Sequence, residues 1–304
     1  MNQHSFSYNI TIPFNLEATL KTHGWFQLTP FYWDDKSKIL NWAVKINEKP
    51  IWVTVRQVNA ENNSTPLQFA VYPENSDPDE KTIINKFRHI FNLDLDLGEF
   101  YKISAKYPLL DQVKKRGMGR LMRAGSVYED IFKSICGTNV QWKQAVKMIN
   151  NIAQLGEPVT GTEYRIFPGP KVVLNAGEKF LKDVGRVGYR SSYLIELCQR
   201  FIDGASEALA VENGEKTGIE LYKYFLGFKG IGKTTARYLS ALYGYFEDMA
   251  VDSLVLSYMA KTHFSGEKPT EKQVEEFYAK FGRWRYLAYW MEFIIAGGWS
   301  PDQN

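Results

Sequence analysis

The sequence predicts an α+β fold, in which an N-terminal antiparallel β-sheet subdomain is followed by an all-helical bundle. Short β-branched and aromatic stretches, separated by turn residues, occupy about the first 75 positions. Beyond about residue 78, apolar residues recur at spacings of three and four, as on one face of a helix. With 304 residues, 44% of them hydrophobic, the chain can bury a substantial core. We place the β-rich subdomain, with some helices, in residues 1–110 and the helical domain in residues 111–304.

The expected strands lie in three short stretches: WAVKI (42–46), IWVTVRQV (51–58) and LQFAVY (67–72). Turn residues separate them, so a small antiparallel sheet or meander follows. The segment THGWFQLTPFYWDD (22–35) is dense in aromatic residues. Such rings usually fill the interface between a sheet and helices. The alternative, which stays open here, is that some of them, Trp25 included, face a ligand pocket.

Capping signals place the helices that follow. Asp77-Pro-Asp79 precedes an apolar stripe that ends at Phe91, and Ser126 with Glu129 forms a capping box that opens a helix ending near Cys136. A second box, formed by Thr270 and Gln273, opens a helix near the end of the chain. Further helices are expected at about 141–155, as a pair within 171–203, and at about 253–262 and 283–296.

A glycine turn between two helical patterns dominates residues 218–245. Gly230 and Gly232 flank the apolar Ile231, and Lys233 follows directly. Glycine lets backbone amides turn outward, and amides at a helix N-terminus attract anions. The turn therefore predicts an anion site, most simply one for phosphate.

Two motifs fit this turn. Gly227 through Thr234 satisfies the pattern G-x-x-x-x-G-K-[ST] of nucleotide-triphosphate loops, which requires a buried strand just before it. The preceding residues show helical periodicity instead. We therefore favour a helix-hairpin-helix that grips a nucleic-acid backbone phosphate.

The turn, followed about twenty residues later by Val251-Asp252, resembles the signature of the helix-hairpin-helix (HhH-GPD) DNA glycosylase superfamily. Two further segments, 118–145 and 185–194, resemble 8-oxoguanine glycosylases, and 281–302 resembles bacterial alkylpurine (3-methyladenine) glycosylases. The resemblance implies a catalytic role for Asp252 and backbone binding by Gly230, Ile231, Gly232, Lys233 and Thr235.

Asp252 suits the chemistry that the resemblance implies. Cleavage of an N-glycosidic bond develops positive charge on the sugar, which a fixed carboxylate stabilises while it orients or deprotonates the attacking water. From its position alone, an aspartate that opens a helix is more often only an N-cap.

The chain departs from the 8-oxoguanine pattern beside the turn. Bifunctional members carry a nucleophilic lysine two residues after the second glycine, where this chain has Thr234. Lys233 is one residue earlier, which rotates a helical side chain by about 100°. We therefore expect Lys233 to face phosphate and Thr234 to lie near the base pocket, with Tyr238 and Trp25. The near-terminal Trp-Tyr pair of alkylpurine members falls on Ile294-Ile295.

Three residues match the void-filling residues of the 8-oxoguanine glycosylases: Asn139, Tyr189 and Arg190. Extrusion of a base leaves a gap in the stack, which such side chains fill. The resemblance implies that Arg190 donates to the unpaired base or stacks as a plane. A loop cap for Asn139 and a half-buried core ring for Tyr189 are the ordinary alternatives.

The distribution of charge favours a nucleic-acid partner. The net charge is only +3, but residues 101–150 carry ten basic and three acidic side chains. A basic stretch lies just ahead of a predicted helix, and we interpret it as a DNA-binding surface or, alternatively, a solvated helix face: Lys114, Lys115, Arg116, Arg120 and Arg123.

Cofactor and membrane signals are absent from the sequence. Cys136 and Cys198 are its only cysteines and four histidines are scattered, so we expect no metal, no cofactor and no disulfide framework. No signal peptide or membrane-length apolar run is visible, which predicts a cytoplasmic protein, such as one of the bacterial cytosol or nucleoid.

Taken with the resemblance, these features predict a monomeric, monofunctional DNA glycosylase. It would flip a damaged purine out of double-stranded DNA and hydrolyse its glycosidic bond. A bifunctional 8-oxoguanine-type glycosylase/lyase is one alternative. A catalytically silent, structure-specific DNA-binding module is another.

Overall fold

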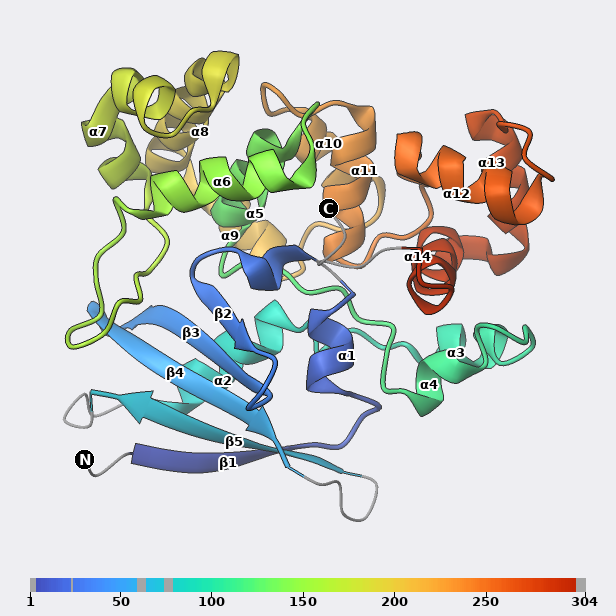
Figure 1. Ribbon diagram of the computed structural model, residues 1–304, viewed down its shortest axis with the longest axis horizontal. Coiled ribbons are helices and arrows are strands. Elements are labelled where there is room, and N and C mark those ends of the chain that lie inside the picture. Colours follow the sequence, from blue (N-terminus) through green and yellow to red (C-terminus); the bar gives the residue numbers. More distant parts are fainter. Residues whose placement is uncertain (1–3, 23, 59–63, 74–78, 299–304) are drawn as a thin grey trace.

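A computed structural model describes residues 4–22, 24–58, 64–73 and 79–298. It has an antiparallel five-stranded sheet followed by helices, which confirms the predicted α+β class (Figure 1). The strand order is β1-β5-β4-β3-β2. The strands are β1 (His4–Ile10), β2 (Phe31–Asp34), β3 (Ile39–Ile46), β4 (Lys49–Gln57) and β5 (Thr65–Tyr72).

Alternating side chains give the sheet one buried face. Val53 lies between Trp42 of β3 and Val71 of β5 in the register, and all three side chains are buried. Helix α2 (Glu80–Ile90) packs on the same face, where the Phe69 and Phe87 rings meet edge to face at 5.2 Å. Successive side chains of a strand point to opposite faces, so every second residue contributes to this buried face.

Two strands were not singled out by sequence. β1 is an edge strand of alternating polar residues, and β2 is a four-residue strand inside the aromatic segment. Both lack the run of β-branched residues that marks β3, β4 and β5. An edge strand pairs with only one neighbour and needs less apolar surface. Asp77 and Pro78 of the expected helix-start signal lie outside the described residues, but Asp79 caps α2 through Thr82 N at 3.1 Å.

Helix α2 lies against one face of the sheet, and most of the other helices are grouped together beyond the sheet (Figure 1). Short helical segments in and after the N-terminal subdomain are α1 (Leu16–Leu20), η1 (Gly24–Gln27), α3 (Gly98–Ser104) and α4 (Gln112–Lys115). The central helices are α5 (Val127–Gly137), α6 (Trp142–Ala153), α7 (Pro170–Asp183), η3 (Gly188–Arg190), α8 (Ser191–Asp203) and α9 (Ala205–Glu212). The last are α10 (Ile219–Leu226), α11 (Lys233–Leu242), α12 (Ser253–His263), α13 (Glu271–Tyr278), η4 (Ala279–Trp284) and α14 (Arg285–Ile295).

Helix α5 forms the centre of the helical part. Every residue from Val127 to Cys136 is buried, including three charged ones, Glu129, Asp130 and Lys133. Glu129 and Lys133 pair at 2.6 Å, and Asp130 accepts three hydrogen bonds. Buried charges require such partners, because an unpaired ion in the interior is costly.

The interpretation of the basic stretch as a DNA-binding surface is wrong for two of its five residues. Arg120 and Arg123 are 2% and 9% exposed. Arg120 donates to the carbonyls of Asn92 and Leu95, and Arg123 donates to the carbonyl of Leu242 at 2.8 Å. Their charges therefore bind backbone carbonyls inside the fold, where DNA has no access.

Candidate active site and DNA interface

The glycine turn joins α10 to α11, as expected for a helix-hairpin-helix. Gly230 has φ of +89°, and the buried Ile231 donates its N–H to the Phe228 carbonyl at 3.1 Å. Gly232 caps α11 without a side-chain hydrogen bond. The first amides of a helix have no intrahelical acceptor, so those of Lys233, Thr234 and Thr235 remain available to an anion.

The two glycines of the turn serve different needs. A Cβ on Gly230 would lie 2.6 Å from Cδ2 of Tyr193, so the fold itself requires glycine there. Gly232 has φ of −87°, and a Cβ built on it meets nothing within 4 Å. No described neighbour therefore requires glycine at 232, whereas a ligand that approaches the amides closely would.

Asp252 opens α12 close to this turn. Its Oδ1 accepts the N–H of Val255 at 2.9 Å, and the side chain is exposed. Thr234 Oγ1 donates to the carbonyl of Val251 at 3.4 Å. The side chain at 234 therefore faces the segment that carries the carboxylate, while Lys233 is exposed and pairs with no described carboxylate.

Helix α14 brings tyrosines near Asp252 that sequence reasoning missed. Burial chiefly raises the pKa of Tyr286 and of Tyr289, and the negative charge of Asp252 raises both further. The expected equivalents, Ile294 and Ile295, instead pack partly buried against the core. The available signal was the aromatic spacing of three and four along α14, which from sequence alone indicates core packing as readily as a site.

Trp25 and Tyr238, two predicted pocket residues, lie together. Trp25 is 3% exposed, and its ring meets Tyr238 edge to face at 6.3 Å and stacks with Trp142 at 5.9 Å. The Trp25 indole N–H donates to Asp130 Oδ1 at 2.6 Å. Thus a residue of the N-terminal subdomain is held against α11, the second helix of the hairpin.

The carboxylate of Asp130 accepts hydrogen bonds from three parts of the chain at this contact. Besides Trp25, it accepts the Ala124 N–H at 2.9 Å and the Tyr243 hydroxyl at 2.8 Å. Burial raises the pKa of Asp130 to about 6, although the three hydrogen bonds oppose the rise. The guanidinium of Arg123 lies 4.4 Å from the Tyr243 ring centre and closes the cluster.

The three predicted void-filling residues differ in exposure. Asn139 is exposed, with φ of +52°, in the loop between α5 and α6. Tyr189 is 56% exposed, whereas Arg190 is only 5% exposed. Arg190 donates to the carbonyl of Thr138, next to Asn139. The structure thus brings Arg190 to the Asn139 loop but buries its charge.

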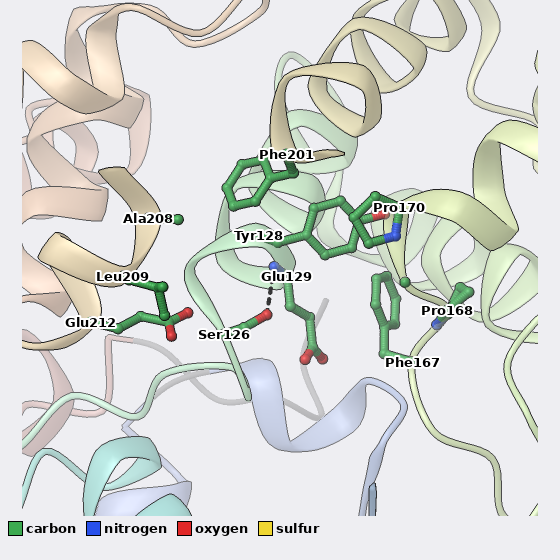
Figure 2. A pocket seen from close by; sticks show the side chains of 11 residues that line it. Ser126, Tyr128, Glu129, Phe167, Pro168, Pro170, Phe201, Ala208, Leu209 and Glu212 are labelled. Carbon is green, nitrogen blue, oxygen red and sulfur yellow. Dashed lines mark hydrogen bonds between the residues drawn. The ribbon is translucent and has the colours of Figure 1, made fainter. Parts of the chain in front are cut away.

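Three cavities among the described residues are lined by none of the predicted site residues. One of about 350 Å³ is lined by the start of α5, the Phe167–Pro170 turn, α8 and α9 (Figure 2). Figure 2 shows Leu209 and Glu212 on one side of it and Phe167 and Pro168 on the other. It lies at the opposite end of α5 from Asn139 and contains no predicted site residue. Another, about 450 Å³, runs along α12 from Ser253, with Lys261 and Lys268 in its lining. The third, about 870 Å³, lies on the sheet and is lined by residues such as Trp52, Gln68 and Tyr164.

Neither a metal site nor a membrane span is found in the part of the chain that the structure describes. No three His, Cys, Asp or Glu side chains group there as metal ligands. No described helix is long and apolar enough to cross a membrane.

Comparisons with known proteins identify the family of this chain. The model of the family "HhH-GPD superfamily base excision DNA repair protein" matches residues 132–283, half of the chain. A "Probable N-glycosylase/DNA lyase" of Methanothermobacter thermautotrophicus is 28% identical over 144 residues, 40% of this chain and 45% of that protein. The match therefore spans less than half of that relative's length.

Solved structures of two kinds of glycosylase share the fold. A 3-methyladenine DNA-glycosylase from Archaeoglobus fulgidus superposes with a TM-score of 0.74 at 20% identity, over 96% of this chain and 98% of that one. A Clostridium acetobutylicum 8-oxoguanine glycosylase/lyase, in complex with double-stranded DNA containing cytosine opposite 8-oxoG, superposes with a TM-score of 0.68 at 20% identity, over 98% of both chains.

Proposed function

Since this chain belongs to the HhH-GPD superfamily of base excision DNA repair proteins, we propose that it is a monofunctional DNA glycosylase. Its substrate is double-stranded DNA with a damaged purine, and its reaction is hydrolysis of the N-glycosidic bond. The relatives named above include both glycosylases and glycosylase/lyases, so the choice between the two rests on the residues of this chain. A monomeric state and a cytoplasmic location stay predictions from the sequence.

The hairpin supplies the anchor in this proposal. A backbone phosphate binds the open amides at the start of α11, where the bare Gly232 allows close approach. Lys233 adds a cation beside that phosphate. Asn139 and the exposed ring of Tyr189 fill the gap in the stack once the nucleotide is extruded.

Asp252 performs the chemistry. Its exposed carboxylate is fixed by the Val255 amide at the start of α12, so it does not have to reorganise as charge develops on the sugar. The carboxylate stabilises the cationic sugar and orients or deprotonates the water that replaces the base. In this proposal the extruded purine lies beside the side chains predicted to line the base pocket, Thr234, Tyr238 and Trp25; because Trp25 is 3% exposed, it supports the pocket from behind Tyr238.

The observation that carries the monofunctional assignment is the hydrogen bond from Thr234 to Val251. It turns the side chain at 234 toward the segment ending in Asp252, and that side chain is a hydroxyl rather than an amine. Without an amine there, no Schiff base forms with the sugar. Lys133 is no substitute, because it is fully buried and paired with Glu129.

The test is single-turnover excision by wild type and Asp252→Asn on duplexes carrying 3-methyladenine, 7-methylguanine, hypoxanthine or 8-oxoguanine. Asparagine still caps a helix, so the fold should persist, while loss of the charge should slow excision by about a hundred- to thousand-fold. Glu247→Gln, an exposed carboxylate on the same connector, is the matched control and should excise normally.

Two results would contradict the proposal. Excision by folded Asp252→Asn at the wild-type rate would reduce Asp252 to a helix cap. Efficient trapping of wild type on DNA by borohydride would show that the protein is a lyase and not a simple hydrolase, because only an imine intermediate is reduced to a stable adduct.

A further inference from the structure

The loop that carries Asn139 is short and is held at both ends. At its start, Thr138 Oγ1 donates to the Ile135 carbonyl at 2.8 Å. At its end, the Trp142 indole N–H donates to Gln27 Oε1 at 2.8 Å, and a Cβ on Gly24 would collide with the same ring. Asn139 itself adopts φ of +52°, a conformation that needs support from its surroundings.

Arg190 supplies part of that support. Its Nη2 donates to the Thr138 carbonyl, its Nε to Thr138 Oγ1 at 3.4 Å, and its Nη1 to the Val187 carbonyl at 3.3 Å. All three nitrogens of the guanidinium are therefore engaged within the protein. A base contact would require this buried group to exchange those bonds for new ones and to leave the Thr138 carbonyl unpaired.

The same guanidinium touches a line of rings that reaches the hairpin. Its Cζ lies 4.6 Å from the Tyr189 ring centre, and Tyr189 meets Tyr193 at 5.8 Å. Tyr193 in turn lies against Gly230, where a Cβ would approach it to 2.6 Å. The Asn139 loop is thereby connected through packed side chains to the turn that anchors phosphate.

We infer that Arg190 is a positioning residue, which clamps Thr138 so that Asn139 is ready to enter the gap, and that it does not read the unpaired base. The inference rests on the proposed function for the role of Asn139. It changes the role that the resemblance implies for Arg190. It also assigns to Thr138 a part that sequence gave no reason to expect.

The test separates a clamp from a base contact. DNA affinity is measured on duplexes that carry a tetrahydrofuran abasic analogue opposite each of the four bases. The proteins compared are wild type, Arg190→Gln, Thr138→Val, Asn139→Ala and the Arg190→Gln/Asn139→Ala double variant. A clamp predicts that Arg190→Gln loses affinity by a similar factor, about tenfold, opposite all four bases. The double variant should bind no worse than Asn139→Ala alone, because the two residues act as one unit.

Hydrogen exchange of the free proteins gives a readout without DNA. Arg190→Gln and Thr138→Val should both speed exchange at residues 138–142 and leave α11 unchanged. Thr138→Val removes only the Oγ1 contacts and keeps the carbonyl that Arg190 Nη2 binds, so its increase in exchange should be smaller than that of Arg190→Gln. Arg190→Lys, which keeps the charge but cannot make all three bonds, covers the case in which Arg190→Gln folds poorly. Arg56→Gln, which removes an exposed arginine bonded to Gln68 on the sheet, is the control for loss of charge.

The outcomes are distinct. A loss confined to one or two opposite bases, additive losses in the double variant, or unchanged exchange at 138–142 would overturn the clamp. Because neither readout requires excision, they decide the role of Arg190 even if the wild-type protein excises none of the lesions, a result that would overturn only the proposed function.

Discussion

Replacing Asp130 by asparagine should change how stability depends on pH, while preserving most of its hydrogen bonds. Oδ1 accepts both the Trp25 indole and the Ala124 amide, and an asparagine oxygen can do the same. The asparagine amide then faces the Tyr243 hydroxyl, which can accept a hydrogen bond. The substitution therefore removes mainly the titration of a fully buried carboxyl.

The size of the effect follows from the pKa. Burial raises the pKa of Asp130 from 3.8 to about 6 in the folded state. The folded protein thus binds this proton more tightly than the unfolded chain, so the group favours folding more as pH falls through 6 toward 3.8. The full difference corresponds to about 3 kcal/mol, of which about 1 kcal/mol is gained between pH 7 and pH 5.

Urea unfolding of wild type and Asp130→Asn at pH 5, 6, 7 and 8 measures this pH dependence of the unfolding free energy. The difference in unfolding free energy between the two proteins should shift by about 1 kcal/mol in favour of wild type on going from pH 7 to pH 5. Glu267→Gln, at an exposed position, should show no such shift. A difference that is constant with pH, or that moves against wild type in acid, would refute the raised pKa and the burial that causes it.

Three further predictions concern the turn and its neighbours. Lys233→Ala should lower the salt dependence of DNA affinity by about 0.9 log units per log unit of salt, whereas Lys171→Ala, an exposed lysine of α7, should leave the slope unchanged in the same titration. Thr234→Lys should install weak lyase activity, seen as a borohydride-trapped adduct, because position 234 faces the Asp252 segment; complete absence of trapping would place that side chain elsewhere. Gly230→Ala should lower the melting temperature, because the added Cβ collides with Tyr193. Gly232→Ala should melt within about a few degrees of wild type but bind DNA less tightly. A lower melting temperature for Gly232→Ala than for Gly230→Ala would contradict the roles given to the two glycines.

Sequence was sufficient for the parts of this protein that depend on local signals. The hairpin, the capped helices and three strands are marked by glycine spacing, N-cap residues and β-branched runs, which act within a few residues. Of the two predicted capping boxes, Thr270 and Gln273 form one, whereas Ser126 caps α5 alone and Glu129 accepts the Gly125 N–H instead. The distance of Asp252 from the turn singled it out in the same way; its place at the start of α12 is observed, and its catalytic role stays a prediction. The edge strand β1 lacks such a signal, because its polar alternation is common to loops.

Sequence was insufficient where burial of a charged side chain depends on partners far along the chain. Arg120 and Arg123 read as surface cations but bind carbonyls of residues 92 and 242. Arg190 read as a base contact, and only its bonds to Thr138 indicate a clamp. Tyr286, which lies near Asp252, was not predicted as a site residue, because helical spacing alone does not distinguish a ring in the core from a ring beside a site.

The hydrogen bond between Trp25 and Asp130 also bears on how the chain folds. It joins residues 105 positions apart, and Tyr243 reaches the same carboxylate across 113 positions. Contacts of this sequence separation form late and raise the contact order. A fragment that begins at residue 111 would keep Asp130 in the interior without its indole donor, and Trp142 without Gln27. A helical fragment cut free of the sheet should therefore be less stable than the same helices in the whole chain, because the buried Asp130 carboxyl loses a hydrogen-bond donor.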